Sequence, residues 1–502
     1  MKHIVLFGAG KSATVLIDYV NQLAATGVCR VTVADSNLAA VQLKLGVAPT
    51  AVAAEVNIEN ETERQALVQQ ADIVISLMPP ALHYLLALDC VALGKHLLTA
   101  SYTSEELKKL QPEIEAKGLL FLSEMGLDPG IDHMSAMQLI HSIQAAGGII
   151  TAFKSHCGGL VAPESDDNPW HYKISWNPRN VVLAGKSGAV YKEDGREVQL
   201  GYEQLFTTDH LVRVPGLDTL AYYANRDSLS YAALYNLQHA DTFLRTTLRY
   251  PDFCAGWKNI VDLKLTDEEK IYDTNGLSIA AFFKQHFDRY HFNQWLNNLL
   301  SSRLSYVQEM MENLTRLMDA EEQALREGTD PEENFMVVDE KGKLSTVDLA
   351  EVKDKAAETV ALKMHEANTT MKQLLFLGLD DDETLVNKGL CSAADVLQFI
   401  LETKLALQPS DKDLIVMLHE ITFTLLGVTR KINSSLVVKG ADHLRTAMAK
   451  TVGLPLGIAA RLLLEGTIQT RGLHIPIIPA IYEPVLMELA NHGIAFTETD
   501  ET

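Results

Sequence analysis

The first residues of the chain fit the start of a dinucleotide-binding fold. Residues 4–7 form a short apolar run that predicts a buried strand, and Gly8 and Gly10 follow it directly. A helical pattern opens at Lys11, so the segment predicts a strand, a tight turn and a helix start. With Ala13 it reads Gly-x-Gly-x-x-Ala, in which Gly8 permits the turn and Gly10 lets the backbone approach a pyrophosphate. An ordinary strand-to-helix turn is the alternative.

Strand and helix patterns alternate through the first 128 residues, with further strand-like runs at 28–34, 71–77, 95–102 and 119–122. This alternation predicts an α/β fold with a Rossmann-type doubly wound parallel sheet. Ligands of such sheets bind beyond the carboxyl ends of the strands. The candidate site residues are therefore Gly8, Ala9, Gly10, Lys11, Ser12, Asp35, Ser36, Asn37, Leu77, Met78, Pro79, Ser101, Tyr102 and residues 124–129, which include Leu127, Asp128 and Pro129.

Asp35 ends the second predicted strand, where a carboxylate can accept hydrogen bonds from the hydroxyls of an adenine ribose. The same charge repels a 2′-phosphate, so Asp35 favours NAD over NADP. The alternative is a loop residue beside the next helix, whose cap Ser36 or Asn37 could equally supply.

The pattern changes after about residue 130. A strand is predicted over 149–156, and a long loop over 157–176 is dense in glycine, proline and polar residues. Loops of this length inside a compact domain are usually functional. An acidic turn is predicted at 328–333 and a hairpin loop at 339–342. We predict three parts: a Rossmann domain of residues 1–130 plus about 441–502, an α+β substrate-binding and dimerisation domain of about 131–254 plus 410–440, and a mainly helical insertion of about 255–409.

Composition restricts the class of protein. The formal net charge is -22 and no basic cluster suits nucleic acid, so no nucleic-acid partner is expected. The 5 cysteines are dispersed, which argues against a disulfide framework or a metal site. The chain begins directly with a strand and no apolar run is expected to be long enough for a membrane span, so we expect a cytoplasmic protein without a membrane partner.

Polar residues outside the glycine loop suggest a substrate site. Asp128 falls just past a strand end, although a structural turn with Asp132 capping the next helix is an alternative. Arg226 and Arg249 could each bind a carboxylate through two hydrogen bonds. Surface ion pairing is the commoner role of an arginine.

Several longer motifs resemble the saccharopine dehydrogenases of the glutamate-forming type, also called saccharopine reductases. The resemblance covers residues 1 to about 250 and 441–466, and the span of about 255–410 cannot be aligned. The motifs are Ser-Tyr at 101–102, Gly-Leu-Asp-Pro-Gly-Ile-Asp-His at 126–133, Cys-Gly-Gly-Leu at 157–160, Ala-Pro-Glu-Ser at 162–165, Asp-Asn-Pro at 167–169, Asn-Arg-Asp-Ser at 225–228 and Thr-Leu-Arg-Tyr at 247–250.

The resemblance implies an NAD(P)-dependent oxidoreductase of lysine metabolism that acts on a CH–NH donor. Saccharopine, NAD(P)+ and water would give glutamate, 2-aminoadipate 6-semialdehyde and NAD(P)H, or the reverse. Substrate would be held by Ser101, Tyr102, Asp128, Arg226, Thr247, Leu248 and Arg249, and Ser175 would join the cofactor residues named above. Asp128 and Tyr102 are the candidates for proton transfer, with a bound water as the alternative. The family also suggests a homodimer through the second domain's sheet.

The cofactor and the reaction each leave an alternative. Fungal members of the family carry an arginine after the second strand, which suits NADP, whereas this chain has Asp35, Ser36 and Asn37, so we expect NAD. A carboxynorspermidine dehydrogenase, which reduces a different imine, would need fewer carboxylate-binding groups than Arg226 and Arg249 provide. A Rossmann protein that senses NAD(H) without turnover is the third reading.

Overall fold

The computed structural model describes residues 1–501 except 48, 208–209, 328–335, 339–343 and 347–348. The acidic turn predicted at 328–333 and the hairpin loop predicted at 339–342 lie outside the described residues. The chain divides into two compact units: the first comprises Met1–Asp167, His171–Cys254 and Leu405–Thr502, and the second comprises Asn168–Trp170 and Ala255–Lys404. The predicted Rossmann and α+β domains thus lie in one unit.

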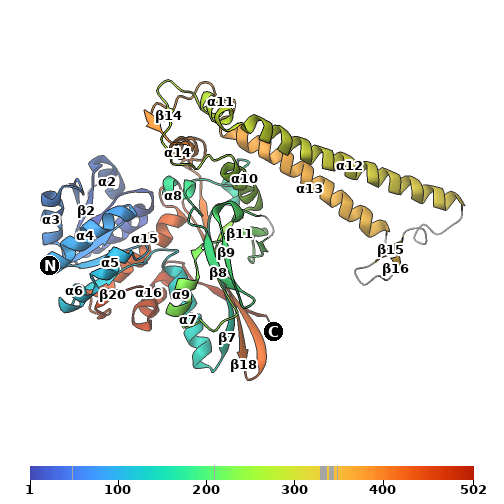
Figure 1. The fold of residues 1–502 in the computed structure, drawn as a ribbon. Helices are drawn as coiled ribbons and strands as arrows, with labels where there is room; N and C mark the ends of the chain where they lie inside the picture. The colour runs from blue at the N-terminus through green and yellow to red at the C-terminus, as the bar shows by residue number, and fades with distance from the viewer. Residues whose placement is uncertain (48, 208–209, 328–335, 339–343, 347–348, 502) are drawn as a thin grey trace. The chain divides into compact units, whose positions relative to one another are not determined.

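The first sheet is a parallel, 7-stranded sheet of strand order β20-β6-β5-β4-β1-β2-β3 (Figure 1). Its inner strand β1, between β4 and β2, is buried throughout, which explains the uniformly apolar run after His3. This order confirms the predicted Rossmann-type sheet. The strands are β1 (His3–Phe7), β2 (Arg30–Asp35), β3 (Val52–Glu55), β4 (Ile73–Ser76), β5 (His96–Thr99), β6 (Leu120–Leu122) and β20 (Gly472–His474).

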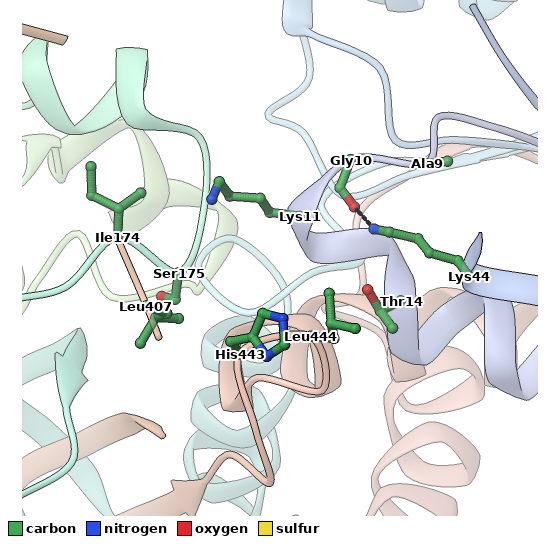
Figure 2. Close-up of a pocket in the computed structure, with 10 residues that line it drawn as sticks. All are labelled: Ala9, Gly10, Lys11, Thr14, Lys44, Ile174, Ser175, Leu407, His443 and Leu444. Atoms are coloured by element: carbon green, nitrogen blue, oxygen red, sulfur yellow. Dashed lines mark hydrogen bonds between the residues drawn. The ribbon is translucent and has the colours of Figure 1, made fainter. Parts of the chain in front are cut away.

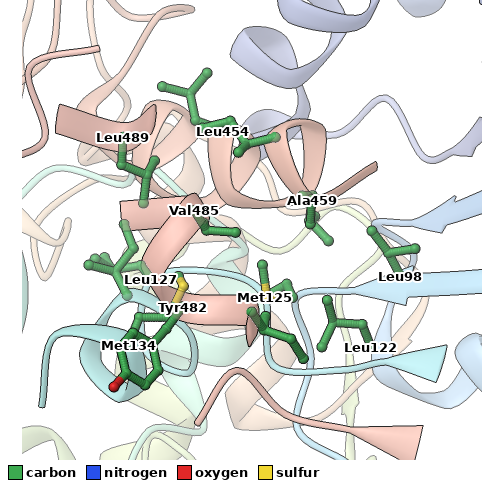
Figure 3. Close-up of a cluster of buried hydrophobic side chains, with 14 of the residues drawn as sticks. Leu98, Leu122, Met125, Leu127, Met134, Leu454, Ala459, Tyr482, Val485 and Leu489 are labelled. Carbon is green, nitrogen blue, oxygen red and sulfur yellow. The ribbon is translucent and has the colours of Figure 1, made fainter. Parts of the chain in front are cut away.

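Helices cover the sheet, and two of them come from the far end of the chain. The N-terminal helices are α1 (Thr14–Ala25), α2 (Leu38–Leu45), α3 (Glu61–Gln70), α4 (Pro80–Leu93), α5 (Glu105–Lys109) and α6 (Gln111–Ala116). Helix α7 (Ile131–Ala145) follows them and packs on the second sheet. The returning helices are α15 (Ala447–Leu464) and α16 (Pro479–Asn491). Figure 3 shows Leu454 and Val485 of these helices beside Leu98 and Leu122 of the sheet, within one buried cluster. The last residues of the chain therefore complete the core that the first residues begin.

Helix α15 corrects one expectation. Among the described residues it alone has the length and apolar composition of a membrane-crossing helix, although no such run was expected. Of the residues in that window, 78% are buried inside the protein. Gly453 and Gly457 explain the close packing, since an added Cβ would lie 2.9 Å from Leu16 or 2.6 Å from Tyr19 of α1. This is the packing of a core helix.

The second sheet is mixed and has 10 strands, with the main order β10-β11-β13-β7-β18-β19-β21. Its strands are β7 (Ile149–Val161), β8 (Ala189–Glu193), β9 (Arg196–Leu200), β10 (Leu211–Val212), β11 (Leu220–Ala224), β12 (Arg226–Asp227), β13 (Thr242–Arg249), β18 (Asp413–Leu425), β19 (Val428–Lys439) and β21 (Thr497–Glu501). The short helices α8 (Pro178–Val182) and α9 (Leu229–Leu234) lie between its strands in sequence. Strand β7 runs past the predicted end at residue 156, because Gly158 and Gly159 still pair with β18. The predicted loop therefore begins after Val161.

The second unit is mainly helical. The 36-residue helix α12 (Phe292–Glu327) pairs with α13 (Leu349–Phe376), and the two run side by side in Figure 1. The other elements from this part of the chain are α10 (Pro251–Asp262), which starts in the first unit, β14 (Tyr272–Asp273), α11 (Ile279–Tyr290), β15 (Met336–Val338), β16 (Leu344–Thr346), β17 (Leu390–Cys391) and α14 (Ala393–Lys404). The sequence predicts helices over 282–300 and 306–325. The first of these spans the end of α11 and the start of α12, and α12 continues through 301–305 without a break.

Candidate active site

The glycine loop borders a cavity of about 270 Å³ (Figure 2). Its lining residues are Ala9, Gly10, Lys11, Thr14, Lys44, Ile174, Ser175, Leu407, His443 and Leu444. The hydroxyl of Thr14 is buried here without a hydrogen-bond partner. A Cβ added at Gly10 would meet nothing within 4 Å, so the loop leaves open space where a pyrophosphate would approach. The cavity therefore offers open space and an unused donor beside the glycine loop, where a pyrophosphate would bind.

Two lysines add positive charge to this cavity. Figure 2 shows Lys44 donating to the carbonyl oxygen of Gly10, with the Lys11 side chain extending the other way, toward Ile174. The pKa of Lys44 is lowered to about 8, mainly by burial and also by the charge of Lys11, whereas Asp35 and Asp18 act to raise it. At neutral pH the ammonium group is therefore still largely charged. These cations suit a phosphate-bearing ligand.

Gly8 shapes the turn before the cavity. Its φ is +106°, and an added Cβ would lie 2.8 Å from the carbonyl oxygen of Leu77. Any other residue would strain this backbone and press against the end of β4. Leu77 is thus a neighbour of the turn through its backbone, next to Met78 and Pro79, which begin the approach to α4.

Asp35 connects the end of β2 to the glycine loop. Its Oδ2 accepts a hydrogen bond from the backbone N–H of Ala9 at 2.7 Å, and its Oδ1 accepts from the N–H of Asn37 at 2.9 Å. Asn37 itself caps α2 by accepting from Ala40 at 3.0 Å. Asp35 is therefore not the helix cap, and its charge lies beside the loop as a ribose-binding residue requires.

Ser101 is held by a buried histidine that the sequence did not single out. His83 of α4 contacts the hydroxyls of Ser76 and Ser101, each at 2.7 Å. Burial lowers the pKa of His83 to about 4, so the ring is neutral at pH 7. A neutral imidazole has one donor and one acceptor nitrogen, which together fix the rotamers of both serines.

The side chains of Tyr102 and Asp128 are in contact, as expected if both belong to one site. The Tyr102 hydroxyl donates to Asp128 Oδ1 at 3.3 Å, and Arg245 donates to the same oxygen at 2.7 Å. Burial raises the pKa of Asp128, although the charge of Arg245 opposes that rise. Burial and then the neighbouring Asp128 raise the pKa of Tyr102, so its phenol stays protonated. Tyr102 can therefore donate a hydrogen bond, while Asp128 is the group that can accept a proton.

Arg245 and its second partner were missed from the sequence. The guanidinium nitrogen that contacts Asp128 also donates to Asp132 Oδ2 at 2.7 Å, and its carbon lies 4.4 Å from the ring centroid of Tyr231. Asp132 also accepts from the N–H of Gly130 at 2.6 Å, but it lies in the first turn of α7, whose N-cap is Gly130 without a side-chain cap bond, so the prediction that Asp132 caps the helix is wrong. The signal for Arg245 was present: residues 245, 247 and 249 alternate along β13 and share one face.

A buried polar network continues from Asp132. His133 contacts Glu124 at 2.8 Å and Tyr235 at 2.5 Å. Glu124 also accepts from the N–H of Thr103 at 3.0 Å and from the hydroxyl of Tyr231 at 3.0 Å. Burial works to raise the pKa of Glu124, but the bond to His133 and the other donors lower it overall. The network thus anchors the segment that carries Tyr102.

Arg249 has a different environment on the same strand face. It is 4% exposed, its Nε is buried without a hydrogen-bond partner, and one terminal nitrogen donates to the carbonyl oxygen of Leu248 at 2.7 Å. The guanidinium carbon lies 5.2 Å from the ring centroid of Tyr172 and 5.3 Å from that of Phe253. In the described part of the chain no carboxylate pairs with it. A buried arginine with an unused donor can bind an anionic group.

The remaining predicted substrate residues differ in position. Arg226 is exposed, has a φ of +52°, and places its guanidinium carbon 5.0 Å from the Tyr102 ring centroid. Thr247 pairs with Cys157 and is partly buried. The Leu248 side chain packs in an apolar cluster with Val416 and Leu418. Leu248 can therefore contribute only its backbone to a ligand site on the Arg249 face.

The polar loop after Val161 is mostly structural. Lys173 pairs with Asp167 at 2.8 Å and Asp411 at 2.7 Å, and Glu164 pairs with Lys439 at 3.0 Å. Of the polar residues in the loop, Ser175 lines the cavity beside the glycine loop. Ser175 is therefore the residue of this loop for which a role in ligand binding remains predicted.

The fold and the site together define a dinucleotide-binding oxidoreductase of the Rossmann class. The family model described as the saccharopine dehydrogenase NADP binding domain matches residues 4–122, and the one described as the saccharopine dehydrogenase C-terminal domain matches residues 126–494. The chain therefore belongs to the saccharopine dehydrogenase family.

Named relatives agree with this assignment. The chain is 30% identical over 500 residues to the saccharopine dehydrogenase [NADP(+), L-glutamate-forming] of Saccharomyces cerevisiae, covering 99% of both chains. The apo structure of the L-Glu forming saccharopine dehydrogenase from that yeast matches all of both chains with a TM-score of 0.77 and 27% identity. The chain is also 33% identical over 443 residues to the alpha-aminoadipic semialdehyde synthase of Arabidopsis thaliana, covering 86% of this chain and 37% of that protein. It thus spans well under half the length of the synthase. The name of the yeast relative carries NADP(+), so it gives no support to the NAD preference expected from Asp35.

Proposed function

We propose that the chain interconverts saccharopine, NAD(P)+ and water with L-glutamate, 2-aminoadipate 6-semialdehyde and NAD(P)H. The single observation that carries this proposal is Arg249, a buried cation with an unused donor and no carboxylate partner in the described chain. Saccharopine has three carboxylates, and one of them would supply the missing anion. The family membership and the names of the relatives support the same reaction.

A dinucleotide would be held by the glycine loop, with Thr14 and the two lysines near its phosphates, Asp35 near its adenine ribose and Ser175 across the cavity. When bound, the dinucleotide accepts or supplies the hydride. The chain's own residues must hold the substrate and move the proton. Leu127 and Pro129 flank Asp128 in the sequence, and we propose that their backbone contacts the dinucleotide.

Asp128 is proposed as the proton-transfer group. Oxidation of the secondary amine requires removal of its proton before the C–N bond gains double-bond character, and Asp128 is the acceptor beside Tyr102. Water then adds to that carbon, and cleavage of the C–N bond releases glutamate and the aldehyde. Tyr102, which stays protonated, fixes the carboxylate by donating to it. In the reverse direction the protonated Asp128 returns the proton to nitrogen.

We further propose that this chain prefers NAD, on the ground of Asp35 alone. Asp35→Arg is expected to raise the NADP-to-NAD ratio of kcat/KM at least about tenfold, because it replaces a repulsive charge with an attractive one near the 2′ position. Fluorescence titration with NADH and NADPH gives the same ratio as dissociation constants. Asp35→Asn is the matched control, since it removes the charge and keeps an oxygen that can accept from Ala9. An unchanged ratio in Asp35→Arg would reject the ribose assignment.

The direct test of the reaction is nicotinamide reduction with purified protein and saccharopine, followed by absorbance, with glutamate assayed in parallel. Equal amounts of reduced cofactor and glutamate support the proposal. Reduction with no glutamate, or no reduction with either NAD or NADP, contradicts it.

A further inference from the structure

We propose that Arg245 is a positioning residue of this site, which holds Asp128 by one carboxylate oxygen and leaves the other oxygen free for the amine of the substrate. The proposal rests on the function proposed above and adds a residue to it. It concerns a side chain that contacts the proposed proton acceptor and makes no contribution of its own to substrate binding.

The geometry assigns the two oxygens of Asp128 different tasks. Oδ1 accepts from Arg245 at 2.7 Å and from Tyr102 at 3.3 Å. In the described part of the chain no donor is bonded to Oδ2. The Asp128 side chain keeps 14% of its surface exposed, whereas that of Arg245 keeps 4%. A carboxylate fixed through one oxygen has a defined rotamer, so its second oxygen points in one direction.

Arg245 is itself fixed from several sides. Its guanidinium bonds Asp132 at 2.7 Å and faces the Tyr231 ring at 4.4 Å, and its backbone N–H donates to the hydroxyl of Ser228 at 3.0 Å. Tyr231 in turn donates to Glu124, which accepts from the backbone of Thr103. The same buried network therefore holds both partners of Asp128, Arg245 directly and Tyr102 through its neighbour.

The carboxylates of this group outnumber the arginines. One arginine faces two carboxylates, Asp128 and Asp132, and the His133 ring lies 3.6 Å from Asp132, so Arg245 is the one permanent cation bonded to the pair in the described part of the chain. A protonated secondary amine at Oδ2 would supply a second cation. Arg249, on the same strand face, has the opposite arrangement, a cation without an anion. The two arginines thus favour a ligand that carries an ammonium group and a carboxylate.

The groups that act electrically on Asp128 come from several elements. Arg245 lowers its pKa from β13, Asp132 raises it and His133 lowers it from α7, and the bond from Tyr102 lowers it. Cys157 of β7 also lies within reach, but burial raises the pKa of its thiol well above the usual range, so it stays neutral. Loss of the Arg245 charge therefore moves the Asp128 pKa upward, and the ionised base persists only at higher pH.

The test is the pH profile of kcat/KM for saccharopine in wild type, Arg245→Met and Arg245→Lys. In Arg245→Met we expect the acid limb of the profile to shift to higher pH by about one unit or more, and the maximal kcat/KM to fall roughly 100-fold. Arg245→Lys should restore much of the limb position, because a single nitrogen makes both carboxylate bonds in the wild type. Arg245→Met/Asp132→Asn, which removes one charge of each sign, should move the limb less than Arg245→Met alone.

The matched control is Arg64→Met, which breaks another buried pair, Arg64 with Asp89 at 2.5 Å, in the Rossmann domain. It should lower stability and leave the acid limb in place. An infrared titration of the protonated Asp128 carboxyl, with Asp128→Asn as the blank, measures the effect of Arg245 on the Asp128 pKa without substrate. The proposal for Arg245 is wrong if Arg245→Met leaves both the acid limb of the pH profile and the infrared titration of Asp128 unchanged. If the wild-type enzyme turns over saccharopine, that result leaves the proposed function intact. Absence of turnover in wild type rejects the proposed function, and the infrared titration still decides whether Arg245 controls Asp128.

Discussion

Arg249→Met is expected to raise the Michaelis constant for saccharopine by at least about 100-fold while the free protein becomes no less stable. In the unliganded structure Arg249 is buried, stacked on aromatic rings and left with an unsatisfied Nε. Methionine fills a similar volume without a charge. Binding therefore loses its anion receptor, and the free energy of unfolding should stay level or rise by up to about 3 kcal/mol, the cost of an unsatisfied buried polar group.

Two measurements on the same variant check this result. Saccharopine kinetics give the loss of binding, and urea denaturation without ligand gives the stability. NADH affinity should be unchanged, since Arg249 does not line the cavity beside the glycine loop. Arg245→Met is the matched comparison on the same strand, and it should be clearly destabilised because Asp128 and Asp132 lose their counter-charge. A large loss of stability in Arg249→Met with unaltered saccharopine kinetics would instead make Arg249 a folding residue.

Asp128→Asn is expected to lower kcat/KM for saccharopine by about 100- to 10,000-fold, because it removes the proposed proton acceptor. Asparagine keeps an oxygen that can accept from Arg245 and Tyr102, so the site geometry should survive. The measurement is steady-state kinetics in both directions, with circular dichroism to verify folding.

Tyr102→Phe provides the control for Asp128→Asn. The Tyr102 phenol stays protonated and serves only to orient Asp128, at 3.3 Å, so its removal should cost about tenfold or less. If Tyr102→Phe loses as much activity as Asp128→Asn, the proton path runs through the phenol. If both variants keep wild-type rates, a bound water carries the proton.

The sequence predicted the Rossmann sheet well because its signals are local. The buried strand β1, the turn at Gly8 and the charge of Asp35 lie close together along the chain, and each has a physical requirement that residue type reveals. Strand β3 and helix α3 were not predicted, since β3 is only partly buried and lacks a uniform apolar run. Strand β20 was missed because it joins the sheet beside β6 far along the sequence.

The site was predicted only in part, for a different reason. Asp128 and Tyr102 follow strand ends, and Arg249 lies in a motif of the family, so residue type and position were sufficient. Arg245, His83 and Glu124 act through partners 117, 18 and 9 residues away. The strand alternation of 245, 247 and 249 places Arg245 on the face of Arg249, but no local pattern identifies its distant partner Asp128. Arg245 and Arg249 are the same residue type on the same strand, so the sequence does not distinguish them. In the structure Arg245 pairs with two carboxylates, whereas Arg249 pairs with none in the described chain.

The return of β20, α15 and α16 to the first domain has a consequence for synthesis on the ribosome. Strand β6 remains an unpaired edge of the parallel sheet, and the α1 groove that takes Gly453 and Gly457 remains open, until almost the whole chain has emerged. The apolar surface formed by Leu98, Leu122 and Met134 is likewise exposed during that interval (Figure 3). A nascent chain stalled before residue 447 should therefore bind holdase chaperones. It should also lack a dinucleotide site, even though every residue of the glycine loop has already been synthesised.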